Sequence, residues 1–405
     1  MIMLRRCLWK TILLILLTVP VRANAYTLLQ FIPVVQLNQL YDDNINLSST
    51  NKKGDFISNL LLGFYLNWTG PERSGSFQYE TIGELFLNYQ KYDNFGQTHY
   101  FEMHDQEHLS DTTTMDLDNW FLTGKTPRSF FVSGGALTAP QTLNSQLALA
   151  ILAKVDSLDD VADINIRHRW SEESAVSAEL HEEYFATSQS TALETKLGLK
   201  EEYAPSPTLR GGLGYQFFDF RFSDAPSPVQ AHFPQLEMHW EASHQLSFGG
   251  SAGPILFEKP QGEGQEVKLG YDGSLGYETD RWNLSVRGGQ GPGITPNGGA
   301  GLTRSALADI RYAWTRRFSL FTSMSYYELE GGGAPLQLLI YGAGISEQVT
   351  RSVSVSVQYV AIREYGSSGD GLTPAPTGPL IGTTTSANAL IVGATIPLEV
   401  FRKGL

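Results

Sequence analysis

The chain has 405 residues, with 29 basic and 42 acidic side chains and a formal net charge of -13. This acidic balance argues against nucleic acid as a partner, because phosphate contacts need lysine and arginine. The length would suit two or three globular domains, but 40 glycines and an aromatic content of 11% are spread over many short segments. The composition therefore predicts one large all-β unit.

The first 25 residues have the order of a secretory signal peptide. Residues 1–10 carry basic side chains and no acid, residues 11–19 are mainly apolar, and Ala23-Asn24-Ala25 is a small-x-small site. The apolar stretch is far shorter than the roughly 20 residues of a membrane-spanning helix, so an anchor is the weaker interpretation. We expect cleavage after Ala25, which leaves residues 26–405 as one mature domain.

Cleavage would change both the charge and the redox chemistry of the chain. It removes four of the 29 basic residues and none of the 42 acidic ones, so the mature net charge is -17. It also removes Cys7, the only cysteine. The mature chain therefore has no disulfides, and its acidic surface is compatible with a lumen that favours cations.

Short polar turns recur along the chain and alternate with longer connections. Seven turns follow an aromatic or apolar residue, and an eighth is Ser110-Asp-Thr-Thr. The seven begin at Trp68, Trp170, Tyr203, Trp240, Tyr277, Trp314 and Ile345. The longer connections are predicted at 41–56, 90–98, 124–160, 186–191, 221–231, 257–265, 289–302, 328–336 and 364–385. This alternation is typical of bacterial outer-membrane barrels, which have short periplasmic turns and longer external loops.

The segments between these connections predict about eighteen strands. They are 28–40, 57–69, 75–89, 99–109, 113–122, 160–170, 175–185, 191–203, 208–220, 232–241, 246–256, 266–277, 282–288, 303–314, 318–327, 337–346, 352–363 and 387–400. An even number places both termini in the periplasm, and sixteen is the alternative if 113–122 or 282–288 is not a strand. A barrel of roughly 16–18 strands leaves an aqueous channel.

Each predicted strand has one apolar and one polar face. Before Tyr203, for example, Leu197 and Leu199 share one face, while Lys196 and Lys200 share the other. Such a period of two predicts that one side meets lipid and the other meets water. An open sheet would leave unpaired backbone groups in hydrocarbon, so we expect a closed antiparallel transmembrane β-barrel.

The apolar faces end in aromatic residues beside the tight turns. Amphipathic rings at this level predict an aromatic girdle at the membrane interface. The predicted girdle residues are Trp68, Trp170, Tyr203, Trp240, Tyr277, Trp282 and Trp314.

The polar faces supply the candidate functional residues, which we expect to line the lumen. They are Glu80, Glu84, Glu102, His104, His108, Arg167, Arg169, Glu179, His181, Glu183, Glu194, Lys196, Lys200, Glu237, His239, Glu241, Asp309 and Arg311. Two of them, His104 and His108, have a spacing that binds metal on a helix, but on a strand they lie about 13 Å apart. We therefore predict no metal site and no cofactor.

Two glycine-rich or apolar connections need separate interpretation. The connection 124–160 contains the apolar segment 146–154, which predicts a loop folded into the lumen that narrows the channel. The alternative is an extra strand pair, which would give twenty strands. The run Gly289-Gln-Gly-Pro-Gly is interpreted as an external turn and not as a phosphate-binding loop, because no helix follows it.

Two motifs near the mature N-terminus resemble a known family. Leu40-Tyr-Asp-Asp-Asn-Ile-Asn-Leu, followed by Asp55-Phe-Ile-Ser-Asn-Leu-Leu-Leu-Gly-Phe-Tyr-Leu, resembles the start of the outer-membrane β-barrel porin families. The resemblance is specific over about the first 70 mature residues and concerns pattern alone beyond them. It implies a porin-like barrel, and some members of these families accompany exopolysaccharide secretion systems. The C-terminus departs from the usual terminal aromatic, because four residues follow Phe401.

These observations predict an outer-membrane channel for passive or weakly selective diffusion of small neutral or cationic solutes. The alternatives are a barrel that exports an exopolysaccharide and a barrel that encloses a periplasmic partner such as an electron carrier. No Gly-x-Ser-x-Gly element and no grouped serine, histidine and acid indicate an enzyme. Expected partners are the outer-membrane bilayer, the barrel-assembly machinery and the permeating solute or polysaccharide. The sequence leaves the solute and the choice between monomer and trimer open.

Overall fold

The computed structural model describes residues 28–45, 51–125, 156–187, 191–223, 227–258, 264–294, 300–330, 336–350, 353–367, 383–397 and 401–404. The predicted signal peptide and most of the loop predicted at 124–160 lie outside these residues. Among the residues described, no helix is long and apolar enough to cross a membrane.

The described chain is almost entirely β-strand, and its strands form one sheet. The strands are β1 (Leu28–Asp42), β2 (Asp55–Thr69), β3 (Arg73–Phe86), β4 (Asn94–Ser110), β5 (Thr113–Lys125), β6 (Asp156–Arg169), β7 (Ser174–Thr187), β8 (Thr191–Ser206), β9 (Leu209–Phe222), β10 (Val229–Glu241), β11 (Leu246–Glu258), β12 (Gln265–Glu278), β13 (Trp282–Ile294), β14 (Ala300–Ala313), β15 (Phe318–Glu330), β16 (Leu336–Thr350), β17 (Val353–Ser367), β18 (Thr383–Pro397) and β19 (Phe401–Gly404).

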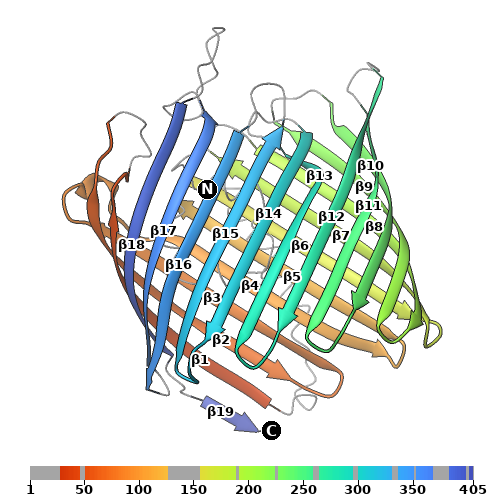
Figure 1. Cartoon of the computed structure of the whole chain (residues 1–405), viewed down its shortest axis with the longest axis horizontal. Coiled ribbons are helices and arrows are strands. Elements are labelled where there is room, and N and C mark those ends of the chain that lie inside the picture. The colour runs from red at the N-terminus through yellow and green to blue at the C-terminus, as the bar shows by residue number, and fades with distance from the viewer. Residues whose placement is uncertain are drawn as a thin grey trace.

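Every strand pairs antiparallel with the next, and the first strand pairs with the last, so the sheet closes into a barrel (Figure 1). Strands β18 and β19 both pair with β1, one after the other, and together they occupy a single position in the wall. The barrel therefore has eighteen positions, which confirms the predicted fold and strand number. The sixteen-stranded alternative is wrong, because both weak segments form full strands, β5 and β13. The periplasmic position of the termini stays a prediction.

The predicted connections are too long at several places. The run that begins at Gly289 is not an external turn: β13 continues to Ile294 and pairs with β14 along its whole length. Glycine and proline favour turns in isolation, but pairing with β14 supplies ladder hydrogen bonds that outweigh this preference. Likewise, β5 extends to Lys125 and β6 begins at Asp156, which shortens the connection predicted at 124–160.

The two faces of the wall differ in chemistry as the alternation predicts. On β8, β9, β10 and β12, the side chains of Leu199, Leu213, Leu236 and Leu269 face outward and are each 61–66% exposed. The residues between them along each strand face inward and are mostly polar or glycine. An apolar outer band around a closed ladder leaves no unpaired strand edge in hydrocarbon, which is the requirement for a transmembrane barrel.

All seven predicted girdle residues lie on the outer face next to the tight turns. Trp170 and Trp314 are the most open, at 58% and 64% exposed. Trp68 packs its ring over the Cα of Gly75 and donates its indole N–H to Asp105 Oδ1 at 3.1 Å. Asp105 is also held by the guanidinium of Arg73, so this acid on the outer face is neutralised by a direct ion pair.

The Tyr-Asp-Asp-Asn motif closes the seam between the first and last strands. Asp43 accepts hydrogen bonds from the backbone N–H of Asn388 at 2.7 Å and from its side-chain amide at 2.6 Å. The Asn388 Oδ1 atom accepts in turn from Tyr359 and Arg363, at 2.8 and 2.9 Å. Asn44 donates to the carbonyl oxygen of Ser386. The motif therefore joins β1 to β18 at the long-loop end of the barrel. We call Asp43 and Asn388, with Tyr359 and Arg363, the seam cluster.

Asp55, the first residue of β2, holds the connection that follows β3 by hydrogen bonds. Its carboxylate accepts the backbone N–H of Asn88, the side-chain amide of Asn88 and the backbone N–H of Tyr89 at 2.8–3.0 Å. It also accepts from its neighbour Phe56. Asp55 is 1% exposed, so these donors have replaced water almost completely.

Candidate functional site in the lumen

All eighteen predicted lumen residues lie on the inner face of the barrel. The cross-strand register brings some of them side by side, such as Glu183 opposite Glu194 and His181 opposite Lys196. Others are placed far apart around the wall: Glu80 lies on β3, whereas Asp309 and Arg311 lie on β14. Three regions of the inner face, between β6 and β14, carry charged side chains or a recess.

The first region is an acidic cluster on β6, β7 and β8, formed by Asp159, Glu183 and Glu194. These side chains are buried, at 1%, 5% and 8% exposed. Below them, His181 Nδ1 lies 2.7 Å from Asp163, and Lys196 Nζ lies 2.5 Å from Glu179. Like charges directly opposite in a sheet are destabilising, so this grouping is not explained by stability of the wall.

The second region is a chain of ion pairs that crosses neighbouring strands. Arg167 on β6 contacts Glu202 on β8 at 2.9 Å, and Lys200 contacts the same carboxylate at 3.1 Å. Lys200 also contacts Glu237 on β10. These groups alternate in sign and are half-exposed, so they present donors and acceptors to the lumen while neutralising one another.

The third region is a recess of about 790 Å³ in the inner wall of β8 to β14. Its floor exists because several inward positions are glycine: Gly249, Gly289 and Gly291 all line it. Charged and amide side chains surround the floor, and Phe218 and Phe233 supply apolar contact. A concave surface with a few convergent polar groups and aromatic rings is the usual form of a small-molecule site.

The recess is internally hydrogen-bonded, which holds its polar groups in place. Gln235 donates to Glu237 at 2.9 Å, and the Ser251 hydroxyl contacts both Gln235 and Asp272. Among the residues that the structure describes, Arg210 has no acidic side chain within ion-pair distance. It lies on the inner face near a tight turn and is open to the lumen.

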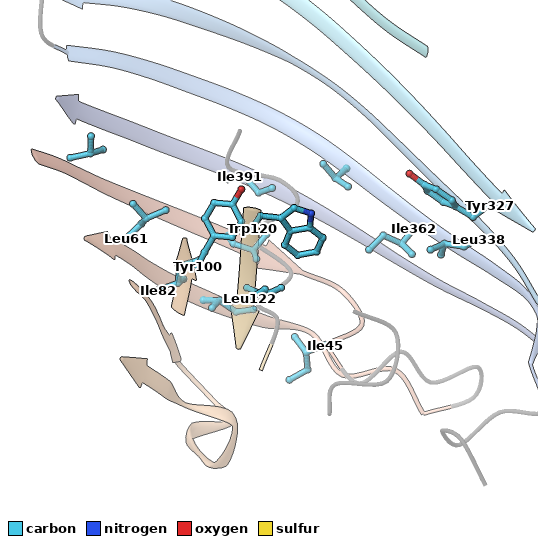
Figure 2. Packing of buried hydrophobic residues seen from close by; sticks show 14 of the residues in the cluster. Ile45, Leu61, Ile82, Tyr100, Trp120, Leu122, Tyr327, Leu338, Ile362 and Ile391 are labelled. Carbon is cyan, nitrogen blue, oxygen red and sulfur yellow. The ribbon is translucent and has the colours of Figure 1, made fainter. Parts of the chain in front are cut away.

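Across the lumen from the ion pairs and the recess, apolar side chains line the inner face near the long-loop end. They belong to ten neighbouring strands, from β15 through β18 and β1 to β6, and form one packed cluster. Figure 2 shows Trp120, Tyr100 and Leu122 on one side of this cluster and Tyr327, Leu338 and Ile362 on the other. We call it the apolar arc. Its side chains are buried although they face the interior of a wide barrel.

The inward-facing histidines of β4, His104 and His108, lie among polar side chains of the inner face. His104 Nδ1 lies 2.5 Å from Asp118 Oδ1, and both side chains are about half exposed. Nearby, the hydroxyls of Tyr65 and Tyr100 donate to Glu80 and Glu102. Within the described ranges, no group of three or more acidic, histidine or cysteine side chains is arranged to hold a metal ion.

Several inner-wall residues were missed by reasoning from the sequence. They are Asp159, Arg210, Asp272 and Arg287. The last three follow from the same alternation of faces, so a strict count along the predicted strands would have found them. Asp159 was assigned to the connection 124–160, and Gly289 and Gly291 of the recess floor were assigned to a turn.

No model of a known protein family matches the chain, and no curated protein matches it. Solved structures of similar architecture include the outer-membrane protein OpdK of Pseudomonas aeruginosa, at 9% identity and a TM-score of 0.43, covering 91% of this chain and 99% of that chain. OccK2 (OpdF) of the same organism has 8% identity and a TM-score of 0.45, covering 91% and 98%. The siderophore receptor PirA of Acinetobacter baumannii has 9% identity and a TM-score of 0.41, covering 91% and 80%.

Proposed function

We propose that this barrel is an outer-membrane channel through which small hydrophilic solutes diffuse. The recess in the inner wall carries the proposal, because it offers charged, amide and aromatic groups to a solute inside a closed wall of eighteen strands. An apolar outer band supports insertion in a membrane, and the Trp-flanked tight turns support a periplasmic position for that end. The proposal is for transport and not for an enzyme.

The lumen favours cations over anions in this proposal. Carboxylates outnumber basic side chains on the inner face, and several of the basic ones are already paired, such as Lys196 with Glu179 and Lys200 with Glu237. A pore lined by one excess sign of charge concentrates the opposite ion.

Single-channel recording of the refolded mature chain tests the proposed function. In planar bilayers with a potassium chloride gradient, we expect steady conductance and a reversal potential that gives a potassium-to-chloride permeability ratio above one. Excess chloride permeability would contradict the assignment of a cation-favouring lumen. A correctly folded barrel that never conducts would overturn the channel itself.

We further propose that the connection between β5 and β6 folds back onto the apolar arc and narrows the channel. Two observations support this. The arc is buried rather than open to the lumen, and Leu122 and Val161, at the two strand ends where the connection leaves and returns, belong to it. The segment 146–154 has the apolar character that such a surface would bury.

Shortening this connection should widen the channel. Lys125 and Asp156 are register partners at the strand ends, so a short Gly-Ser turn in place of residues 128–153 can close the hairpin. We expect conductance to rise, by roughly half or more, because the narrowed cross-section limits the flow. Shortening the connection between β11 (ending at Glu258) and β12 (beginning at Gln265), which lies outside the arc, is the control. Equal conductance of the two shortened proteins would contradict the proposed position of the loop.

The polysaccharide-export alternative stays a prediction. Deleting the gene tests it directly, because loss of surface polysaccharide with normal uptake of small solutes would favour export over diffusion.

A further inference from the structure

We propose that Asp159, Glu183 and Glu194 form a binding site for an organic cation, namely an ammonium or guanidinium group carried by a solute in the lumen. This inference rests on the proposed channel function and names the chemical class of its solute. The site lies on three consecutive strands, β6, β7 and β8.

The register brings the three carboxylates together. Glu183 on β7 is directly opposite Glu194 on β8. Glu183 is also opposite Val161 on β6, and Asp159 is the next inward residue along β6 from Val161. Adjacent strands lie about 4.8 Å apart, so the three acids occupy one small area of the inner wall.

The nearby basic groups do not neutralise this area. His181 contacts Asp163 at 2.7 Å and Glu183 at 3.9 Å, and Lys196 contacts Glu179 at 2.5 Å. Each of these cations therefore has at least one acid of its own outside the proposed site. The five acids of this part of the wall exceed its two bases.

Asp159 is the second, independent observation. It is 1% exposed, and neither of its carboxylate oxygens has a hydrogen-bond partner among the residues described. A buried carboxylate without a partner is costly, and binding of a cation is one of the ways in which that cost is offset. A cation from the lumen would supply the missing partner.

The spacing favours an organic cation over a metal ion. A calcium ion needs six to eight oxygen ligands at 2.3–2.6 Å, and no group of acidic or histidine side chains in the described ranges has that arrangement. An ammonium or guanidinium group instead carries several N–H donors that can reach carboxylates on neighbouring strands. Glu194 also lines the glycine-floored recess, which leaves room for the remainder of the solute.

Titration calorimetry on the full mature chain, folded in detergent, tests the site. The probe is hexamethylenediamine, and hexanediol is the uncharged analogue of the same length. We expect the diamine to bind and the diol not to bind. The triple variant D159N/E183Q/E194Q keeps the shapes of the side chains and should weaken diamine binding by about tenfold or more, because it removes charge-assisted hydrogen bonds.

The variant E241Q/E278Q/D309N is the matched control, since it removes the same charge from the inner wall near the tight turns. Its affinity for the diamine should stay within about twofold of the parent, because screened charges at a distance contribute little. Circular dichroism and heat-modifiable migration in gels show that each variant is folded. Equal losses in both triple variants would mean general attraction to an acidic lumen, and this would overturn the site.

The failures of the two proposals are distinguishable. A parent barrel that conducts but does not bind the diamine overturns the cation site and leaves the channel intact. A barrel that binds the diamine at the three acids but never conducts overturns the channel and keeps the binding site.

Discussion

Replacing Asp55 with alanine is expected to lower the free energy of unfolding by about 3–5 kcal/mol. The substitution removes a carboxylate that is 1% exposed and that accepts the backbone N–H groups of Asn88 and Tyr89 and the side-chain amide of Asn88. A hydrogen bond to a charged group contributes about 1.5–3 kcal/mol. Denaturant titration of the refolded barrel in lipid vesicles, followed by tryptophan fluorescence, measures the change.

The control for this prediction is Asp280→Ala. Asp280 lies in the exposed tight turn between β12 and β13, and the same side chain is removed without stripping a buried acceptor. The expected change is below about 0.5 kcal/mol. If both variants lose the same stability, Asp55 has no special role and the effect belongs to acidic charge in general.

The isosteric variant Asp55→Asn separates charge from hydrogen bonding. It keeps one acceptor oxygen and replaces the other by a donor that faces the N–H groups of the connection. We therefore expect a loss of stability between those of the alanine variant and the control.

Introducing tryptophan at Gly291 should lower the single-channel conductance by roughly a quarter or more, because an indole fills a large share of the recess. Gly291 faces inward on β13, and a Cβ atom added there meets nothing within 4 Å. The new side chain therefore extends into the lumen without disturbing the wall, and stability should change little.

Gly273 provides a close control for this substitution. It lies on the neighbouring strand β12, faces outward, and likewise has nothing within 4 Å of an added Cβ. Gly273→Trp adds the same side chain to the lipid-facing surface, so conductance should stay at the parent value. A similar drop in both variants would show that the recess does not contribute to the path of the ions.

The seam cluster also explains why the motif that begins at Leu40 is placed at the end of the first strand. Closure of a barrel joins strands that are distant in sequence, and Asp43 and Asn388 are separated by 345 residues. Side-chain hydrogen bonds across that join add to the backbone ladder between β1 and β18. The motif that suggested a family from the sequence therefore has a structural role in this chain.

The sequence by itself determined the strand number, the assignment of faces and the position of the aromatic residues beside the tight turns. These features are local: a period of two along each strand and short polar turns between strands can be recognised without knowing any partner. This is why Leu199 and Lys200 were assigned to the correct faces of β8, and why β13 was found even though its second half was assigned to a turn.

Only the tertiary structure decided which side chains meet across strands. The grouping of Asp159 with Glu183 and Glu194 depends on the register of two hairpins, and the recess depends on glycines from several strands. The continuation of β13 to Ile294 likewise depends on its pairing with β14. The physical reason is common to all three. Cross-strand pairing is a non-local interaction, and its free energy outweighs the local preferences that the sequence displays.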